Sequence, residues 1–195
     1  MEIALRTGLT AHLEREETLD QVKELEAFLR DVEARAYRIA SLTVRDADEA
    51  LDLVQEAMIR LATRYQERPS EQWRPLFYRI LGNLTKDWHR RRAVRGRIMS
   101  FFGGLESDVP DPLVTAPGPR EDNPLEELMD RESMEALAAA LRELPGRQRE
   151  AFVLRMLEGL DVAQTAAAMG CSEGSVKTHH SRAVSRLREL LGEHW

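Results

Sequence analysis

The sequence has little of what secreted or membrane-spanning proteins need. Its 195 residues include a single cysteine, Cys171, so an internal disulfide is excluded and a reducing compartment fits. No stretch approaches the about 20 apolar residues that span a membrane. The first 17 residues also lack the apolar core of a signal peptide. We therefore predict a cytoplasmic protein without membrane insertion.

Residues with the spacing of catalytic or metal sites are also missing. The five histidines and Cys171 do not form a set spaced like metal ligands. No Ser–His arrangement, paired carboxylates or glycine-rich phosphate loop stands out. We predict no catalytic residue, no metal and no cofactor, and hence no enzyme. Strand-like alternation of useful length is absent as well, which predicts an all-α fold.

The net charge of −6 divides into two blocks of opposite sign. Residues 60–97 contain eleven basic and three acidic side chains, a net charge of +8. Residues 104–135 contain ten acidic and two basic side chains, a net charge of −8. The acidic total therefore does not exclude a nucleic-acid-binding surface in the basic block.

Apolar residues at helical spacing, interrupted by a proline-rich acidic stretch, predict two small helical domains joined by a flexible acidic linker. We expect a flexible N-terminal lead-in at 1–17 and a first helical domain at 18–96. The linker is expected at 97–124. We assign no role to its Phe101–Phe102 pair. The second domain is expected at 125–195.

One predicted helix of the first domain combines a core stripe with an acidic face. Asp46, followed by Glu49, has the pattern of a capping box. The expected core stripe is Ala47, Ala50, Leu51, Val54, Met58, Leu61 and Ala62. The residues off this stripe are Asp52, Leu53, Gln55, Glu56 and Ile59. Acids beside exposed aliphatics favour a partner protein with a basic surface, although a merely solvated face explains the pattern equally well.

The next predicted helix, from about Trp73 into the arginine run, separates apolar from cationic residues. Its expected buried stripe is Trp73, Leu76, Phe77, Ile80, Leu81, Leu84 and Trp88. Another face carries Arg79, Asn83, Lys86 and Arg90, flanked by Tyr78, Asp87 and His89. Cations, an amide and aromatics together suit phosphate contacts and stacking with unpaired bases.

The stretch 160–191 has the pattern of a helix-turn-helix. A helix over 161–169 precedes Gly170, and Ser172 stands at the expected N-cap of a second helix. Val176, His180, Ala183 and Leu187 form the buried stripe of that helix. Its opposite face presents small, polar and cationic groups, as a major-groove helix does. An ordinary helical hairpin is the plainer interpretation. Upstream, we expect Phe152, Val153, Met156 and Leu157 to form a helical apolar stripe.

Three motifs in this order resemble the extracytoplasmic-function (ECF) group of bacterial RNA polymerase sigma factors. Residues 52–56 (DLVQE) resemble its core-polymerase-binding helix. Residues 76–92, with LFYRI, Asn83, Asp87 and three arginines, resemble its promoter-melting segment. Residues 144–183, with Leu-Pro, REAF and GSVK, resemble its C-terminal DNA-binding domain. The similarity covers roughly 20–95 and 125–192, a first domain of the region 2 type and a second of the region 4 type.

The resemblance implies a sigma factor that binds core RNA polymerase and directs initiation at promoters with −10 and −35 elements. It implies polymerase contacts by Asp52, Leu53, Gln55, Glu56 and Ile59. It implies −10 contacts by Arg79, Asn83, Lys86, Asp87, Arg90, Arg91 and Arg92. It implies −35 contacts by Glu173, Ser175, Lys177, Thr178, Ser181 and Arg182. An anti-sigma factor is a further partner that the resemblance allows.

Some residues depart from the family pattern, and one alternative function stays open. His179, His180 and Thr165 stand where the family often has Arg, a large aliphatic and an aliphatic. His180 lies on the predicted buried stripe, which favours a packed histidine over a sensor or ligand. The alternative is a helix-turn-helix transcription regulator that does not bind core polymerase as an initiation subunit. The response-regulator type would need an α/β receiver, for which the N-terminal half shows no strands.

Overall fold

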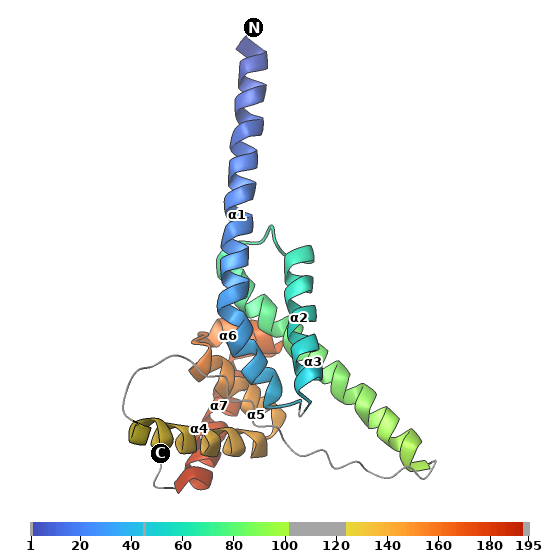
Figure 1. The fold of residues 1–195 in the computed structure, drawn as a ribbon, viewed down its shortest axis with the longest axis vertical. Coiled ribbons are helices and arrows are strands. Elements are labelled where there is room, and N and C mark those ends of the chain that lie inside the picture. Colours follow the sequence, from blue (N-terminus) through green and yellow to red (C-terminus); the bar gives the residue numbers. More distant parts are fainter. Residues whose placement is uncertain (1, 45, 102–123, 193–195) are drawn as a thin grey trace.

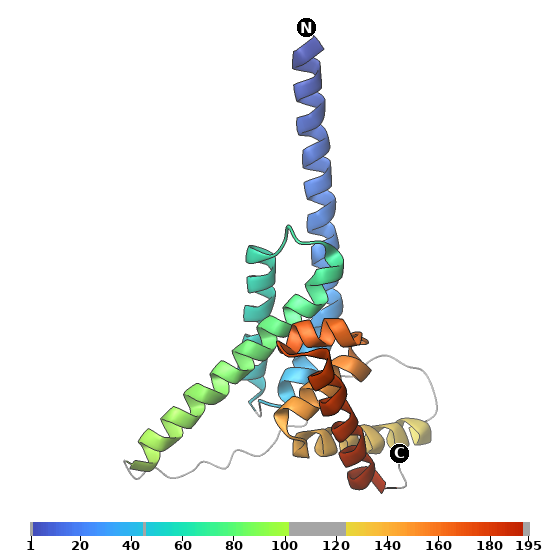
Figure 2. The ribbon, with the colours of Figure 1, turned by 180° about the vertical axis from the view of Figure 1, so that it is seen from behind.

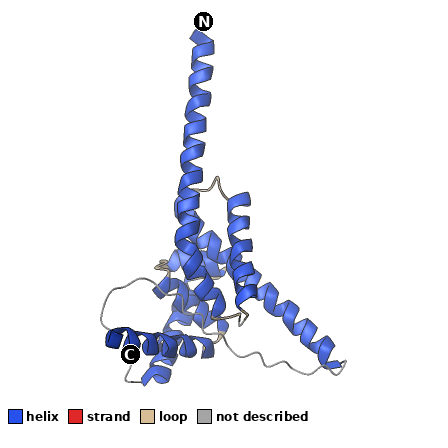
Figure 3. Cartoon of the chain, viewed as in Figure 1, coloured by secondary structure: helices blue, strands red, loops and turns tan. Residues whose placement is uncertain are grey.

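The computed structural model describes residues 2–44, 46–101 and 124–192, with the side chains of 19–44, 46–93 and 133–192. Every regular element in these ranges is a helix, so the predicted all-α fold is confirmed (Figures 1 and 3). None of the described helices is long and apolar enough to cross a bilayer. Most of the predicted linker, including Phe102, lies outside the described residues.

The first three helices form an N-terminal group around one core. They are α1 (Glu2–Ser41), α2 (Ala47–Arg64) and α3 (Ser70–Phe101), and the N-terminal part of α1 projects beyond the other helices (Figure 1). Trp73 and Phe77 of α3 are fully buried among aliphatic residues of α1 and α2. Phe77 meets the ring of Phe28 edge-on, with centroids 6.3 Å apart. The apolar stripe predicted for α3 therefore faces the core.

Both long helices extend further than the sequence predicted. Helix α1 begins at Glu2 rather than near Thr18, and α3 continues to Phe101. The sequence prediction relied on apolar periodicity, which reports packing rather than helix formation. Segments rich in Ala, Leu, Glu and Arg form helix without such periodicity because their intrinsic helix propensity is high.

The core stripe of α2 is placed differently from the prediction. Leu53 is only 6% exposed, whereas Leu51 is 37% exposed, so the prediction that Leu53 lies on the outer face is wrong. Leu53 and Ala57 join the buried side of the helix with Ala50 and Leu61. Because Leu51 and Leu53 are both aliphatic, the sequence alone allows either one to face the core. Packing against α1 and α3 decides that Leu53 does.

The start of α2 ties it to α3. The Asp46 carboxylate accepts hydrogen bonds from the backbone N–H groups of Asp48 and Glu49, as an N-cap does. The Glu49 carboxylate accepts a hydrogen bond from the indole Nε1 of Trp88 at 3.0 Å. The predicted N-cap is therefore present, but the Glu49 side chain makes this tertiary contact instead of completing a capping box.

The remaining helices form a C-terminal group with a smaller core. They are α4 (Pro124–Glu143), α5 (Gly146–Phe152), the π-helical turn η1 (Val153–Leu157), α6 (Val162–Met169) and α7 (Glu173–Leu191). Its buried apolar residues are Ala140, Leu141, Leu144, Phe152, Val153, Ala183 and Leu187. The core thus joins α4, α5 and α7.

The π-helical turn changes which side chains of its segment are buried. Phe152, Val153 and Leu154 are buried, but Met156 and Leu157 are exposed, so the predicted inward stripe is wrong at those two positions. A π turn holds one more residue than an α turn, which rotates the following side chains to a different face. Periodicity counted at 3.6 residues per turn misses this shift.

The two groups are packed on each other. Helix α6 lies beside α3 (Figure 2), and one apolar cluster includes Phe77 and Leu81 from α3 and Leu154 and Met169 from the C-terminal group. Tyr78, predicted to flank the cationic face of α3, is instead buried in this cluster. Burial, reinforced by the negative charge of Glu158, raises the pKa of the Tyr78 hydroxyl far above its usual range.

Candidate nucleic-acid interface

The helix-turn-helix is built by local capping interactions. Asp161 and Gln164 form a reciprocal capping box at the start of α6, with the Gln164 N–H donating to Asp161 at 2.7 Å. Gly170 ends α6 in the left-handed conformation, with φ 64° and ψ 46°. The Ser172 hydroxyl then accepts the N–H of Ser175 at 3.2 Å and begins α7. The predicted turn is confirmed residue by residue.

Replacing Gly170 with alanine should lower the free energy of unfolding by about 1–2 kcal/mol, because a Cβ disfavours the left-handed conformation. Thermal unfolding followed by circular dichroism measures the change. Gly146→Ala is the matched control, since Gly146 has no positive φ and an added Cβ there meets nothing within 4 Å. Equal melting temperatures for the two variants would contradict the assigned turn geometry.

Helix α7 separates a buried stripe from an exposed polar face. Val176, Ala183 and Leu187 are buried, as predicted. The predicted −35 residues on the other face are exposed at Glu173, Lys177, Thr178, Ser181 and Arg182 and half-buried at Ser175. The Thr178 hydroxyl donates to the carbonyl of Gly174, and the hydroxyls of Ser172 and Ser175 are 2.9 Å apart. Lys177 and Arg182 are therefore exposed cations on the face opposite the buried stripe.

The unusual residues of this motif are accommodated within the C-terminal group. Thr165 is fully buried, and its hydroxyl donates to the Asp161 carbonyl at 2.6 Å, which satisfies the polar atom inside the helix. His180 stacks on Phe152 with centroids 6.1 Å apart. Burial, with a smaller effect of the Arg155 charge, lowers the pKa of His180 and favours the neutral ring. The structure thus supports the packed-histidine interpretation.

Helix α3 presents a second cationic surface. Arg79, Asn83, Arg90, Arg91 and Arg92 are exposed. The guanidinium of Arg92 lies 5.2 Å from the centroid of the Trp88 ring, and Arg90 pairs with Asp87 on the same helix. Exposed guanidinium groups along successive turns can contact a run of phosphates.

The middle of this α3 surface is covered by the C-terminal group. Lys86 pairs with Glu150 of α5, Nζ to Oε1 at 3.2 Å. A Cβ added at Gly82 would lie 3.1 Å from the same Glu150 oxygen, so α5 approaches closely here. Partial burial and the charge of Arg149, with a smaller effect of Arg92, lower the pKa of nearby His89. The family resemblance implied a −10 contact at Lys86, but no pattern in the sequence indicated its pairing with Glu150.

The third surface is the outer face of α2. Asp52, Gln55 and Ile59 are exposed, with Ile59 at 57%. Glu56 is half-buried and pairs with Arg60 one turn later, Oε1 to Nε at 2.6 Å. Four of the five predicted polymerase contacts therefore share an accessible face, while Leu53 does not.

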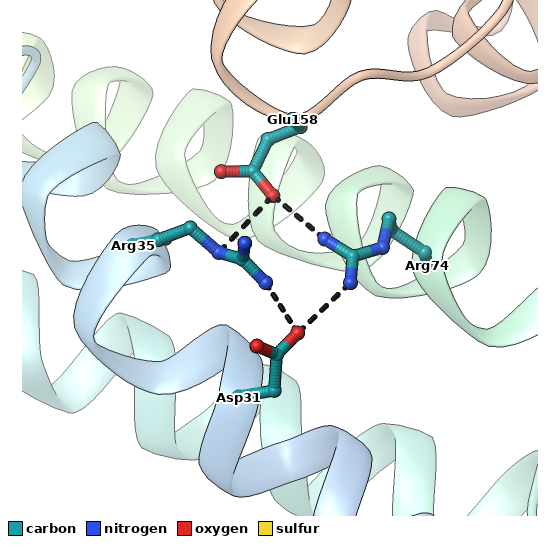
Figure 4. Close-up of polar contacts among 4 residues, drawn as sticks. All are labelled: Asp31, Arg35, Arg74 and Glu158. Atoms are coloured by element: carbon teal, nitrogen blue, oxygen red, sulfur yellow. Dashed lines mark hydrogen bonds and ion pairs between the residues drawn. The ribbon is translucent and has the colours of Figure 1, made fainter.

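A four-residue ion cluster, Asp31, Arg35, Arg74 and Glu158, joins the two groups and was missed by sequence reasoning (Figure 4). Arg35 comes from α1, Arg74 from α3 and Glu158 from the end of η1. Arg74 Nη1 donates to Glu158 Oε2 at 3.1 Å. These residues are up to 127 positions apart in the chain, so no local motif indicates the cluster. Among the described side chains, no three His, Cys, Asp or Glu residues are grouped to hold a metal.

Two regions of the chain match known protein families. Residues 25–95 match the family Sigma-70 region 2, which covers most of α1–α3. Residues 134–187 match Sigma-70, region 4, which includes the helix-turn-helix. The fold and the matched regions thus define a sigma-70-type transcription initiation factor.

The chain is also similar to individual sigma factors from several bacteria. The ECF RNA polymerase sigma factor SigX of Bacillus subtilis is 31% identical over 165 residues, covering 80% of this chain and 79% of that protein. The RNA polymerase sigma-E factor of Streptomyces coelicolor is 30% identical and covers 89% of each. The solved structure of the sigma factor RpoE from Bartonella quintana, in complex with the anti-sigma factor NepR, has 27% identity and a TM-score of 0.60. It covers 88% of this chain and 98% of that one.

The chain belongs to the ECF group of RNA polymerase sigma factors. It directs promoter-specific initiation of transcription as a subunit of RNA polymerase. The resemblance inferred from the three sequence motifs is therefore confirmed.

Proposed function

We propose that α7 contacts the −35 element in the duplex and that α3 contacts the melted −10 strand. The observation that carries the first assignment is the exposed Lys177 and Arg182 on the outer face of a capped helix-turn-helix. The second assignment is supported by the exposed Arg79, Asn83 and Arg90 along α3. Cations at both sites hold phosphates, and amide and hydroxyl groups contact base edges.

The remaining predicted contacts take supporting roles in this proposal. On α7, Glu173, Ser175, Thr178 and Ser181 lie near the base edges or the backbone. On α3, Lys86 and Asp87 contact exposed bases of the single strand, and Arg91 and Arg92 hold its phosphates. The protein itself supplies no catalytic group, because polymerase performs nucleotidyl transfer. It acts in the cytoplasm, where polymerase and the chromosome meet.

Core polymerase, in the same proposal, binds the outer face of α2. Asp52, Gln55 and Glu56 supply acids and an amide for a basic surface, and Ile59 supplies an exposed apolar anchor. Leu53 is left out because its side chain faces the core. An anti-sigma factor is proposed as a further partner, on the ground that the related RpoE was solved with one.

Ile59→Asp should weaken binding to core polymerase about tenfold or more, because truncating a central apolar anchor costs over 1–2 kcal/mol. Binding is measured by titrating labelled protein with purified core enzyme. Met134→Asp is the matched control, since Met134 is a similarly exposed aliphatic on α4 outside the proposed surfaces. An Ile59 variant that binds as tightly as the Met134 variant would overturn the assigned α2 surface.

A further inference from the structure

Glu158 is an acid of the C-terminal group whose partners all come from the N-terminal group. Its side chain is 1% exposed, and Oε2 lies 3.1 Å from Arg74 Nη1 and 3.8 Å from Arg35 Nε. Asp31 holds both guanidinium groups from the opposite side, with Arg74 Nη2 at 2.9 Å (Figure 4). The cluster therefore places two cations from α1 and α3 between two carboxylates, one from each group.

In this arrangement Glu158 can stay buried only while the two groups are in contact. A buried carboxylate without a partner is strongly unfavourable, and here the cations are supplied only across the interface. When the groups separate, Glu158 regains water and Arg35 and Arg74 keep Asp31. The ion cluster can therefore open without leaving a buried charge behind.

The other contacts between the two groups are also of a kind that can separate. Besides the apolar cluster, Lys86 pairs with Glu150, and Arg149 Nη1 donates to the Leu42 carbonyl at 3.3 Å. A pocket of about 300 Å³ lies between the groups nearby and is lined by residues of both, such as Ile39, Leu81 and Val153. Lys86 and Glu150 line this same pocket, so their ion pair joins the groups where the apolar contact is interrupted.

The closed arrangement is incompatible with simultaneous binding to both promoter elements. Elements named −10 and −35 lie about 25 base pairs apart, which is roughly 85 Å of duplex at about 3.4 Å per base pair. Helix α6 contacts both α3 and α7, so the two proposed DNA-binding helices lie much closer together than that. The groups must therefore separate on a promoter, and Glu150 must leave Lys86.

We propose that the ion cluster centred on Glu158 is a latch that holds the free sigma factor closed, with part of the −10 surface covered. This inference rests on the proposed function of α3 and α7. Opening the latch exposes Lys86 and the Gly82 face of α3 to single-stranded DNA. Because apparent affinity scales with the open fraction, opening and DNA binding should rise by the same factor.

The test uses the full chain with spin labels at Thr63 of α2 and Arg186 of α7, both exposed, after Cys171→Ala. Pulsed dipolar spectroscopy should give one narrow distance for the otherwise unchanged protein. Glu158→Gln should shift the distribution to longer distances and raise the open fraction about tenfold, since an ion pair with partly exposed partners is lost. Affinity for a single-stranded −10 oligonucleotide should rise by the same factor.

Two further variants keep this test decisive. Glu189→Gln makes the same substitution in an exposed pair with Arg186, so in this control the second label moves from Arg186 to Ser185. Arg35→Met with Arg74→Met opens the latch from the N-terminal group and leaves the C-terminal group unaltered. Circular dichroism confirms that each variant is folded.

The outcomes separate the latch from the proposed function. Each variant is compared with the otherwise unchanged protein that carries the same two labels. A shift for Glu158→Gln that is no larger than the shift for Glu189→Gln overturns the latch. An opened variant with unchanged oligonucleotide affinity overturns the claim that closure covers the DNA surface. If no form binds the oligonucleotide, the proposed role of α3 fails instead, and the distance measurement alone decides the latch.

Discussion

Removing both Lys177 and Arg182 as alanine variants should lower the affinity of the polymerase-bound sigma factor for −35 promoter DNA about a hundredfold. Each cation lies on the exposed face of α7, and a good contact to a base or phosphate contributes about 1–3 kcal/mol. Two lost phosphate neutralisations should also reduce the slope of log affinity against log salt by about 1.8. Fluorescence anisotropy over a salt series measures both quantities.

The matched control for that prediction is Lys23→Ala with Arg30→Ala. These two α1 cations are exposed and pair with Asp20 and Glu26 on their own helix, so the control removes the same charge away from α7. We expect near-normal promoter affinity and salt slope. Equal losses in the two double variants would show that the effect reflects net charge, and α7 would lose its assignment as the −35 helix.

Phe77→Ala should destabilise the N-terminal group by about 3–5 kcal/mol, because it leaves a large cavity beneath α1. Phe77 is fully buried and contacts Tyr78 edge-on, with centroids 5.2 Å apart. This loss is a large part of the total free energy of unfolding of a small domain. We therefore expect the variant to fail in promoter melting at growth temperature. Denaturant unfolding and permanganate footprinting of the −10 region check the two consequences.

Leu19→Ala serves as the control for Phe77, since Leu19 is an exposed aliphatic on α1. Its expected effect is within about 0.5 kcal/mol. A Phe77 variant that unfolds at the same denaturant concentration as the Leu19 variant would show that Phe77 is not part of the core.

Local sequence signals predicted the local parts of the structure well. The caps at Asp46 and Ser172, the left-handed Gly170 and the buried stripe of α7 each depend on residues a few positions apart. Their physical causes, capping hydrogen bonds and burial on one helix face, are present in the short segment itself. The helix-turn-helix could therefore be predicted without tertiary information.

Features set by packing between distant segments were predicted poorly. The choice between Leu51 and Leu53 for burial depends on where α1 and α3 lie, and the π-helical turn exposes Met156 and Leu157 against the 3.6-residue pattern. The pairing of Arg74 with Glu158 joins residues 84 positions apart. None of these leaves a periodic or short-range trace in the sequence.

The proposed polymerase and DNA roles are tested most directly by transcription in vitro with the purified chain, core RNA polymerase and a promoter library. The structure predicts that the chain alone enables core enzyme to start RNA at a defined set of promoters, and that Ile59→Asp and the Lys177 and Arg182 double variant each reduce this activity. Initiation that requires a second sigma factor, with this chain only changing its rate, would contradict the assignment and favour a helix-turn-helix regulator.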